Sequence, residues 1–556
     1  MTNETLVMVD NEDNVLGREP RQICHEGYGK AHRAISTLIF NHKGEVLLQQ
    51  RSKQKQLWPG YWDVSCATHV HPEETYESAG ERRLPQELGF ARELEYLAKF
   101  QYQINYTPNS SENEMCALLL GKYDGAIKSN GNEIKDYKWI RLDDLVYDIS
   151  ANPEKFTPWL KLSLEELQKN RAKADEILKE LSLFEKKIKK PEIGKNLKEE
   201  YYNLLTKVGK TVDEVVLNFY ENEIFREFPE KKQLYKKMLD RKIGTQKLRA
   251  MAAYLAFMAF NGEKILDDEK VRRIIAAVEL ENWSNYELNW VFDGKSNTRD
   301  ILAIKEAGLA THGFMNDALR LVWDMPEISR TFLEINDRVH RGWTPELYDL
   351  TLENKAILSD FEKFWKAYEI RNIEAGGQFY GNYVTLAYQY SGHKNDLLHK
   401  QLKKIYQDFG AYVQIVNDIG DFALKPKDSR PFVSEKVIAD QFSDLRNGPV
   451  TWPTWLMYNR CSNEDRNFLH SVAINRELDS EGQARVSKLF YETGTYDTLC
   501  QALRTKKQRL EQKIHCLDIE PRTRGLIKSM IVMIPSNRIV HTLDNIQKES
   551  QGGNEK

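Results

Sequence analysis

The pattern of hydrophobic residues changes once along this chain of 556 residues. Up to about residue 145, short runs such as AISTLIF, EVLLQQ and MCALLLG are separated by turn-forming stretches such as NHKGE and KSNGNE, a pattern typical of β-strands. One amphipathic stretch, ETYESAGERRLPQELG, predicts a helix that ends at Gly89. From Pro158 onward, helical periodicity replaces the alternation. The sequence therefore predicts an α/β region followed by an all-α region.

The length of the chain exceeds what one ordinary hydrophobic core accommodates, so at least two domains are expected. A charged run after the α/β region predicts a connecting helix, and Pro191 and Gly194 mark its end. The last residues, KESQGGNEK, have the composition of a disordered tail. We therefore predict an α/β domain at 1–168, a helical linker at 169–194, an all-α domain at 195–545 and a tail at 546–556.

Charge and composition exclude several classes of function. The formal net charge of -3 gives no electrostatic footprint for nucleic acid, so no nucleic-acid partner is expected. The six cysteines are scattered without close pairs, which favours a reducing compartment. The first residues do not resemble a signal peptide, and no apolar run approaches the 20 residues of a transmembrane helix. These features predict a soluble cytoplasmic protein.

Five residues of the first region have the chemistry of metal ligands. His25 and His32 flank the start of a predicted strand, and His69 lies on the segment before the predicted helix. Glu112 and Glu114, in the run SENEM, share a face if this run is a strand. Three imidazoles and two carboxylates suit Zn²⁺, Mn²⁺ or Mg²⁺. Spacing alone leaves the cluster a hypothesis, because single residues of these types are more often surface or core residues without a ligand.

Residues 5 to about 165 resemble type I isopentenyl diphosphate isomerases, which have the Nudix fold. The resemblance is carried, in order, by VDNEDNVLG, CHEGYGKAHRAIS, LLQQRSKQKQLWPGYWD, ERRLPQELG, QYQINYTPNSSENE and FTPWL. It implies that the cluster of three histidines and two glutamates binds a metal. It further implies that a carboxylate holds Mg²⁺ on the substrate's diphosphate (Glu87), that four cations contact this diphosphate (Arg21, Arg51, Lys55, Arg83), and that two aromatic side chains face the reacting alkene (Tyr102, Trp159).

The isomerase reaction that this resemblance implies adds one proton to a double bond and removes another, so it needs two proton-transfer groups. Glu114 is one of them, but the cysteine that the family places two residues before the loop histidine is Ala67 here. Cys66 is one residue away, and adjacent residues of an extended segment point to opposite sides. We therefore expect the thiol to be absent from the site. The alternative is a one-residue slip that makes Cys66 the catalytic thiol.

A Nudix hydrolase is an alternative interpretation of the same region. Hydrolysis needs a helix whose glutamates bind several Mg²⁺ ions and activate water. Here Thr68, Arg83 and Gln86 occupy positions that the hydrolase motif gives to glycine or acidic residues, and only Glu74 and Glu87 remain. Such a helix can hold one ion but is poorly equipped to activate water. Hydrolysis of a small prenyl diphosphate stays open as the less favoured hypothesis.

The helical region contains a weak metal-binding motif in the run VQIVNDIGD. On a helix, Asp418 and Asp421 lie three residues apart and face the same way, which suits Mg²⁺ ions that bridge to a diphosphate. The runs DFGAYVQIVNDIGDF and GTQKLRAMAAYLAF resemble segments of trans-prenyl diphosphate synthases, which have the all-α terpenoid synthase fold. The resemblance implies Mg²⁺ ligands at Asp293, Asp418 and Asp421, basic substrate contacts at Lys247, Arg249 and Arg299, and a possible homodimer.

The first aspartate motif of this family is eroded, because Asn289 and Trp290 stand where two aspartates are expected. With few carboxylates left, binding of three Mg²⁺ ions is expected to be weak. The leading hypothesis is a multifunctional enzyme of isoprenoid biosynthesis that couples an isomerase-like module to a prenyltransferase-like module, with reduced or changed activity. The alternatives are a terpene synthase (a cyclase) and a non-catalytic regulatory protein that binds isoprenoid diphosphates.

Overall fold

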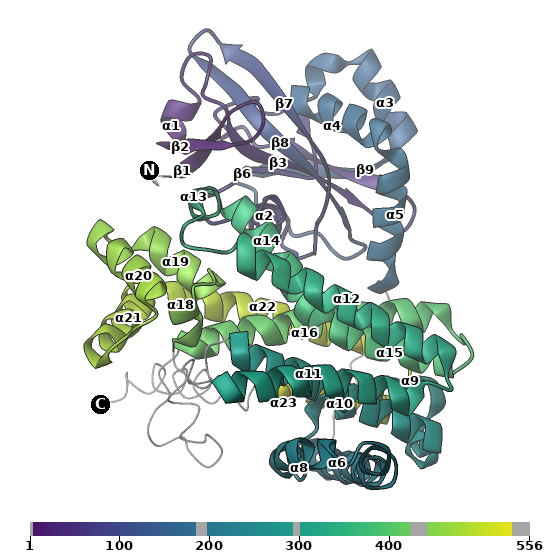
Figure 1. Cartoon of the computed structure of the whole chain (residues 1–556). Coiled ribbons are helices and arrows are strands. Elements are labelled where there is room, and N and C mark those ends of the chain that lie inside the picture. Colours follow the sequence, from purple (N-terminus) through teal and green to yellow (C-terminus); the bar gives the residue numbers. More distant parts are fainter. Residues whose placement is uncertain (1–3, 185–196, 293–300, 423–441, 536–556) are drawn as a thin grey trace, which may run out of the picture. The chain divides into compact units, whose positions relative to one another are not determined.

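A computed structural model describes residues 4–184, 197–292, 301–422 and 442–535 of the chain (Figure 1). The chain divides into two compact units. The first unit comprises residues 1–186 together with 359–365, and the second comprises 187–358 together with 366–556. The first is built on a β-sheet and the second on α-helices, so the predicted fold class is confirmed.

The sheet of the first unit has nine strands, and β3 lies at its centre. Strand β3 pairs in parallel with β8 and antiparallel with β1, β4 and β6, while β7 and β8 form a long antiparallel hairpin. All nine residues of β3 are buried, as expected for a central strand covered on both faces. The strands are β1 (Thr5–Val9), β2 (Val15–Pro20), β3 (His32–Phe40), β4 (Glu45–Arg51), β5 (Trp62–Asp63), β6 (Cys66–His69), β7 (Glu95–Thr107), β8 (Ser110–Lys122) and β9 (Ile134–Arg141).

Helices cover the two faces of this sheet with two separate hydrophobic clusters. The site-side cluster lies between the sheet and the helices α4 and α5, and it includes Leu118, Trp58 and Trp159. The helix-side cluster lies under α2 and includes Ile35 and Leu84. The helices of this unit are α1 (Arg21–Cys24), α2 (Tyr76–Leu88), α3 (Leu142–Ala151), α4 (Pro158–Lys169) and α5 (Arg171–Leu181).

Helix α2 begins and ends as the sequence predicts. The hydroxyl of Thr75 accepts a hydrogen bond from the backbone N–H of Ser78, and the hydroxyl of Ser78 accepts one from the backbone N–H of Thr75, which forms a capping box. At the other end Gly89 adopts a left-handed conformation with φ of 74°. A side chain at residue 89 would also collide with the backbone of Lys128, so the helix stop depends on glycine.

The segment predicted as a linker, 169–194, begins instead with helix α5, which belongs to the first unit. This helix packs on β7 and β8 because its inner face is apolar: Ala174 is buried, and Leu178 packs on the site-side cluster. Lys173 further donates a hydrogen bond to the carbonyl of Leu97 on β7. The high charge of α5 therefore reflects its exposed face, as in a surface helix of a domain.

The described residues of the second unit form helices and connecting turns, apart from one isolated β-bridge. Helix α9 is buried along nine successive residues, Ala250 to Met258, so it runs through the interior of the bundle. The helices are α6 (Leu197–Phe219), α7 (Phe225–Glu227), α8 (Lys231–Lys242), α9 (Leu248–Asn261), α10 (Glu269–Phe292), α11 (Ile301–Val322), α12 (Pro326–Tyr348), α13 (Lys355–Ser359), α14 (Phe361–Ile370, which begins in the first unit), α15 (Gln378–Tyr390), α16 (Asp396–Phe422), α18 (Ser443–Asn447), α19 (Trp452–Arg460), α20 (Asn463–Asn475), α21 (Ser480–Glu492), α22 (Thr495–His515) and α23 (Pro521–Pro535).

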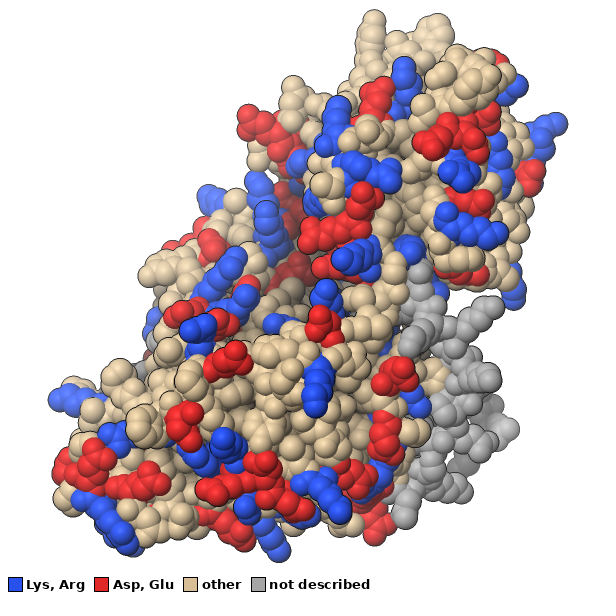
Figure 2. Space-filling view, turned by 90° about the vertical axis from the view of Figure 1, so that its right-hand side faces the viewer, with Lys and Arg blue, Asp and Glu red and all other residues tan. Residues whose placement is uncertain are grey.

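On the face shown in Figure 2, lysine and arginine are interspersed with aspartate and glutamate, and no extended patch of one sign is visible. Within the described ranges, no helix combines the length and apolarity that a bilayer crossing requires.

Candidate functional site

Three histidines of the first unit converge at one end of the sheet. Their ring centroids are 4.9, 5.0 and 5.1 Å apart, so His25, His32 and His69 form a nearly equilateral triangle. Glu112 on β8 completes a group whose possible ligand atoms all lie within 4.8 Å of one another. The structure therefore brings together residues separated by as many as 87 positions in the sequence.

The register of the strands explains why these side chains meet. His32 pairs directly with Glu114 of β8, and His69 of β6 pairs with Ala34, which is two residues after His32 on β3. Paired residues and residues two apart point to the same face of a sheet, so His32, His69 and Glu114 share one face. Gly29 supplies the tight turn before β3, because a side chain there would collide with the carbonyl of Cys24.

Backbone carbonyls fix which ring nitrogen faces the centre of the triangle in two of the three histidines. The Nδ1 of His25 donates to the carbonyl of Arg21, and the Nδ1 of His32 donates to that of Lys30, both at 2.7 Å. Their Nε2 atoms therefore face the centre: that of His32 is buried without a hydrogen-bond partner among the described residues, and that of His25 lies 3.0 Å from Oε2 of Glu112. Ring nitrogens that converge in this way, oriented by backbone carbonyls, are what a metal site requires.

The charge state of the triangle also suits a metal. Burial, and then the neighbouring histidine, lower the pKa of His32 to about 4 and that of His69 to about 3. Both rings are therefore neutral at pH 7 and need not lose a proton to bind an ion. Burial alone would lower the pKa of His25, but Glu112 outweighs it and raises this pKa. The donor set fits a divalent cation that accepts nitrogen ligands.

Glu114 and Tyr102 form a hydrogen-bonded pair next to the triangle. The Tyr102 hydroxyl donates to Oε2 of Glu114 at 2.5 Å, and the two residues are paired across β7 and β8. The other oxygen, Oε1, lies 3.5 Å from Nε2 of His69 and 3.8 Å from Nε2 of His32. Burial raises the pKa of Tyr102 well above its ordinary value, so it stays a phenol. The pair thus joins a proton acceptor to a proton donor.

Aromatic rings form a wall beside this pair. The rings of Tyr102 and Trp159 are 6.3 Å apart and nearly parallel, and Trp58 meets Trp159 edge to face at 5.1 Å. All three side chains are at least nine-tenths buried within the site-side cluster. Such π faces stabilise positive charge that develops next to them.

Strand β6 decides which of two adjacent residues reaches the site. Ala67 pairs with Ser36 of β3 and packs on the site-side cluster that contains Tyr102 and Trp159. Cys66 pairs with Thr37 and belongs to the helix-side cluster under α2, where it is fully buried. Burial raises the pKa of the Cys66 thiol well above its ordinary value. The structure has no one-residue slip here, so it places the catalytic candidate Cys66 on the wrong face of the sheet.

Arg51, predicted to contact a diphosphate, is held inside the fold. Its Nη1 donates to Asp63 at 2.9 Å, and its other nitrogens donate to the carbonyls of Leu57 and Trp58. Asp63 is fully buried and also accepts from the Trp159 indole at 2.6 Å. Arg51 therefore positions the aromatic wall through Asp63. Sequence reasoning missed Asp63, because a single acidic residue in a two-residue strand carries no periodic signal.

Replacing Asp63 with alanine is expected to destabilise the first unit by about 3–5 kcal/mol, because Arg51, whose side chain is only 12% exposed, would lose its counter-charge. The measurement is urea unfolding followed by tryptophan fluorescence. The matched control is Asp175→Ala, which removes an exposed helical ion pair with Arg171 and should cost about 0–1 kcal/mol. An equal decrease in the free energy of unfolding in the two variants would show that Asp63 does not anchor the aromatic wall.

Glu87, the predicted Mg²⁺ ligand of the diphosphate, lies on α2 among cations. It is fully buried, and Arg83 donates to it at 2.8 Å. Lys55 lies 3.5 Å from it and also pairs closely with Glu133. The structure thus gathers the predicted Glu87, Lys55 and Arg83, and it adds Glu133, which sequence reasoning did not single out. Arg21 stands apart and pairs with Glu4 at 3.4 Å.

The other acidic residue that a hydrolase would use is already neutralised. Two nitrogens of Arg82 donate to the carboxylate of Glu74 at 2.5 and 3.1 Å, and the backbone N–H of His71 donates to it as well. A carboxylate held in this way is poorly placed to take up Mg²⁺ and activate water.

The predicted site residues of the helical unit also have internal partners. The ammonium of Lys247 is fully buried and lies within 3.0 Å of Asp213 and of two backbone carbonyls. Arg249 is stacked on Phe379, and its Nη1 has no hydrogen-bond partner among the described residues. The structure brings Asp418 and Asp421 to the end of α16. Asp293 and Arg299 lie outside the described residues, as do the side chains of Asn289 and Trp290.

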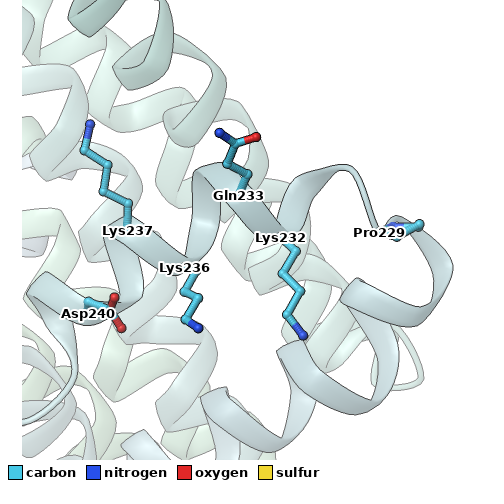
Figure 3. A pocket seen from close by; sticks show the side chains of 6 residues that line it. All are labelled: Pro229, Lys232, Gln233, Lys236, Lys237 and Asp240. Atoms are coloured by element: carbon cyan, nitrogen blue, oxygen red, sulfur yellow. The ribbon is translucent and has the colours of Figure 1, made fainter.

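A surface hollow of about 700 Å³ lies along α8 of the helical unit (Figure 3). Its basic side chains point in different directions, Lys237 to one side and Lys232 and Lys236 to the other. Lys232 pairs with Glu221, and Lys237 pairs with Glu306, both at 3.2 Å. Surface lysines that diverge and pair with carboxylates do not form a binding site, so we assign no ligand to this hollow.

Comparisons with known proteins support the class that the first unit defines. Residues 30–160 match the model of the NUDIX domain. An isopentenyl-diphosphate Delta-isomerase of Serratia proteamaculans is 34% identical over 168 residues, which are 30% of this chain and 93% of that protein. Isopentenyl-diphosphate Delta-isomerase 1 of Photorhabdus laumondii is 36% identical over 169 residues, which are 30% of this chain and 96% of that protein.

The first unit is therefore a Nudix domain. More specifically, through this unit the chain belongs to the isopentenyl-diphosphate Delta-isomerase family, because it covers nearly the whole length of these relatives at more than 30% identity. The structure of a decaprenyl diphosphate synthase from Rhodobacter capsulatus aligns with 61% of this chain and 99% of its own, with a TM-score of 0.49 and 14% identity.

Proposed function

We propose that the first unit binds a five-carbon isoprenoid diphosphate beside a divalent metal and transfers protons to and from its double bond. The observation that carries this proposal is the position of the Glu114–Tyr102 pair, which lies between the converging histidine nitrogens and the aromatic wall. Isomerisation of a double bond needs a proton donor and acceptor next to a surface that tolerates positive charge. The family to which the unit belongs acts on isopentenyl diphosphate.

The proposed metal would be held by His25, His32, His69 and Glu112, with Glu114 as a fifth ligand. Nitrogen-rich sites favour Zn²⁺ or Mn²⁺ over Mg²⁺, which prefers oxygen ligands and retains its water. When bound, such an ion supplies positive charge that keeps the adjacent carboxylates ionised. We assign Mg²⁺ instead to the diphosphate, where Glu87 would be its protein ligand.

The roles proposed for the chain's own residues follow from their positions. Glu114 takes or gives the proton at the substrate carbon, and Tyr102 shares its proton with Glu114 through their hydrogen bond. The Trp159 ring faces the charge that develops on the alkene. Arg83 and Lys55 would move from Glu87 and Glu133 to the diphosphate when substrate binds, while Arg51 stays with Asp63.

The reaction is expected to be slow because only one side of the substrate has a proton-transfer group. The resemblance in sequence implies a cysteine as the second proton-transfer group, and Ala67 stands at its position. The methyl group of alanine cannot transfer a proton. Binding without turnover is therefore the second candidate function, and Ala67 is the observation that favours it. In that case the unit would sense or deliver isoprenoid diphosphates.

Proton exchange distinguishes these two functions. The purified full chain is incubated with isopentenyl diphosphate in D₂O, with Mg²⁺ plus Zn²⁺ or Mn²⁺, and deuterium uptake and dimethylallyl diphosphate are followed by NMR. Slow exchange supports isomerisation. Calorimetric binding without exchange supports the second candidate, and release of inorganic phosphate or pyrophosphate would favour hydrolysis. If neither binding nor exchange is found, the proposal is wrong.

Replacing His32 with alanine is expected to weaken metal binding by at least about 100-fold. Substitution of residues that only orient the metal ligands already lowers metal affinity by about 10–100-fold. The measurement is metal content after dialysis against a chelator buffer, with Zn²⁺ and Mn²⁺ offered separately. The matched control is His42→Ala, which removes an exposed histidine of the same unit that pairs with Asp124. Equal metal content in both variants would place the metal elsewhere.

For the helical unit we propose a prenyl diphosphate synthase-like role that consumes the product of the first unit, with terpene cyclisation as the alternative. The support is its resemblance in sequence together with the buried Lys247 just before α9 and Arg249 on α9, whose Nη1 has no hydrogen-bond partner among the described residues. Labelled isopentenyl and dimethylallyl diphosphates with Mg²⁺ would give longer chains in the first case and a hydrocarbon in the second. Light scattering of the full chain tests the homodimer that we expect.

A further inference from the structure

Asp418, predicted to bind Mg²⁺ in the helical unit, is already fully hydrogen-bonded. It lies on α16 with only 1% of its surface exposed. The hydroxyl of Tyr368 donates to its Oδ2 at 2.6 Å, and Nη1 of Arg371 donates to Oδ2 at 2.9 Å and to Oδ1 at 3.2 Å. Both oxygens therefore accept hydrogen bonds, and one of their donors carries a positive charge.

Arg371 is fixed in this position from several sides. It lies at the start of the π-helix Arg371–Gly377, which continues into α15, and it is 5% exposed. Its Nε donates to Glu346 of α12 at 2.6 Å, and Nη1 also reaches the side-chain oxygen of Asn372 at 3.3 Å. The guanidinium thus lies between carboxylates from two other helices, α12 and α16.

Close packing between the π-helix and α16 keeps the ion pair in place. A side chain at Gly410 of α16 would meet the carbonyl of Gly376 at 2.5 Å, and one at Gly377 would meet the carbonyl of Gln407 at 2.7 Å. Only glycine permits this approach of the two backbones. The π-helical turn therefore lies directly on α16. The close approach is at Gly410, which is eight residues before Asp418 on the same helix.

The second aspartate of the motif has a structural role of its own. Asp421 accepts hydrogen bonds from the backbone N–H groups of Ser443 and Asp444 at 3.1 and 3.0 Å, and from the hydroxyl of Ser443 at 3.1 Å. It therefore anchors the start of α18, where unpaired backbone donors need an acceptor. Both carboxylates of the motif are thus engaged within the protein.

Magnesium does not fit this arrangement. Mg²⁺ requires near-octahedral oxygen ligands at about 2.0–2.1 Å and retains several waters, so it needs open carboxylate oxygens and space for its hydration shell. Asp418 offers neither, since a guanidinium and a phenol cover it. We propose that Arg371 is a built-in cation that takes the place of a divalent metal at Asp418, so that the helical unit binds no Mg²⁺ at this motif.

The proposal concerns the helical unit only and does not depend on the metal or the substrate of the first unit. The prenyl diphosphate synthase-like reaction proposed above for the helical unit would then have to proceed without a Mg²⁺ ion on Asp418.

Counting bound Mn²⁺ tests this proposal. Mn²⁺ is titrated into the full chain and into Asp418→Asn, with and without inorganic pyrophosphate, and free Mn²⁺ is measured by electron paramagnetic resonance. Arg371 keeps its other carboxylate partner, Glu346, in this variant, and the side-chain oxygen of the new amide can still accept from Tyr368 or Arg371. We expect the same number of bound ions and the same affinities in both proteins. Loss of one bound ion in Asp418→Asn would overturn the proposal.

A second variant tests the replacement itself. Arg371→Met removes the guanidinium and keeps a long side chain, so Asp418 becomes available to a cation. We expect Mg²⁺ to raise the melting temperature of Arg371→Met and to leave that of the double variant Arg371→Met/Asp418→Asn unchanged. If both variants respond equally to Mg²⁺, the ion does not compete for the position of Arg371 and the proposal fails.

Discussion

Replacing Ala67 with cysteine is expected to raise the rate of isopentenyl diphosphate isomerisation by about 10²–10⁴-fold, the usual contribution of a positioned proton-transfer group. Ala67 lies on the face of β6 that packs on the site-side cluster with Tyr102 and Trp159. A thiol at residue 67 would therefore face the substrate pocket and complement Glu114. The measurement is the rate of dimethylallyl diphosphate formation by the full chain at saturating substrate.

An existing cysteine on the other face of the sheet provides a matched control for this gain. Cys66 belongs to the helix-side cluster, and burial raises the pKa of its thiol well above its ordinary value. Alanine at residue 66 should leave the rate of Ala67→Cys essentially unchanged. If Ala67→Cys binds substrate but gives no gain, the pocket itself has changed and the unit is a binding module.

The fold was largely predictable because its signals are periodic. The alternation in runs such as AISTLIF predicts strands, and the same period of two explains why Ala67 and Cys66 lie on opposite faces of β6. The triangle of histidines could be assembled only by resemblance, since nothing in the spacing of His25, His32 and His69 indicates the strand register. That register depends on long-range pairing of β3 with β6 and β8.

Partners of charged residues were not predictable from the sequence. Nothing local indicates that Arg371 binds Asp418, because the pair joins different helices through tertiary packing. Arg51 binds Asp63 only because β4 pairs with the two-residue strand β5, which no periodic pattern predicts. Matching Arg51 and Asp418 to family positions therefore predicted ligand contacts, whereas the structure shows both side chains held by buried partners. A residue at a position where a family contacts its ligand can make the same contact only if neighbouring residues do not already bind its side chain.

Replacing Glu114 with glutamine is expected to lower proton exchange at the substrate by about 10²–10⁴-fold, because no other carboxylate among the described residues is hydrogen-bonded to Tyr102. An amide keeps the shape of the side chain and can still accept the hydrogen bond from Tyr102, but it cannot take up a proton from carbon. The measurement is deuterium uptake from D₂O into isopentenyl diphosphate, and metal content is determined on the same samples.

Two further measurements separate catalysis from metal binding in this variant. Glu114 lies 3.5 Å from the nearest ring nitrogen of His69, whereas Glu112 approaches His25 to 3.0 Å, so we expect Glu114→Gln to retain more metal than Glu112→Gln. Tyr102→Phe keeps the aromatic ring and removes only the phenol, and its loss of exchange should be smaller than that of Glu114→Gln. Undiminished exchange in a metal-loaded Glu114→Gln protein would assign the proton transfer to another group.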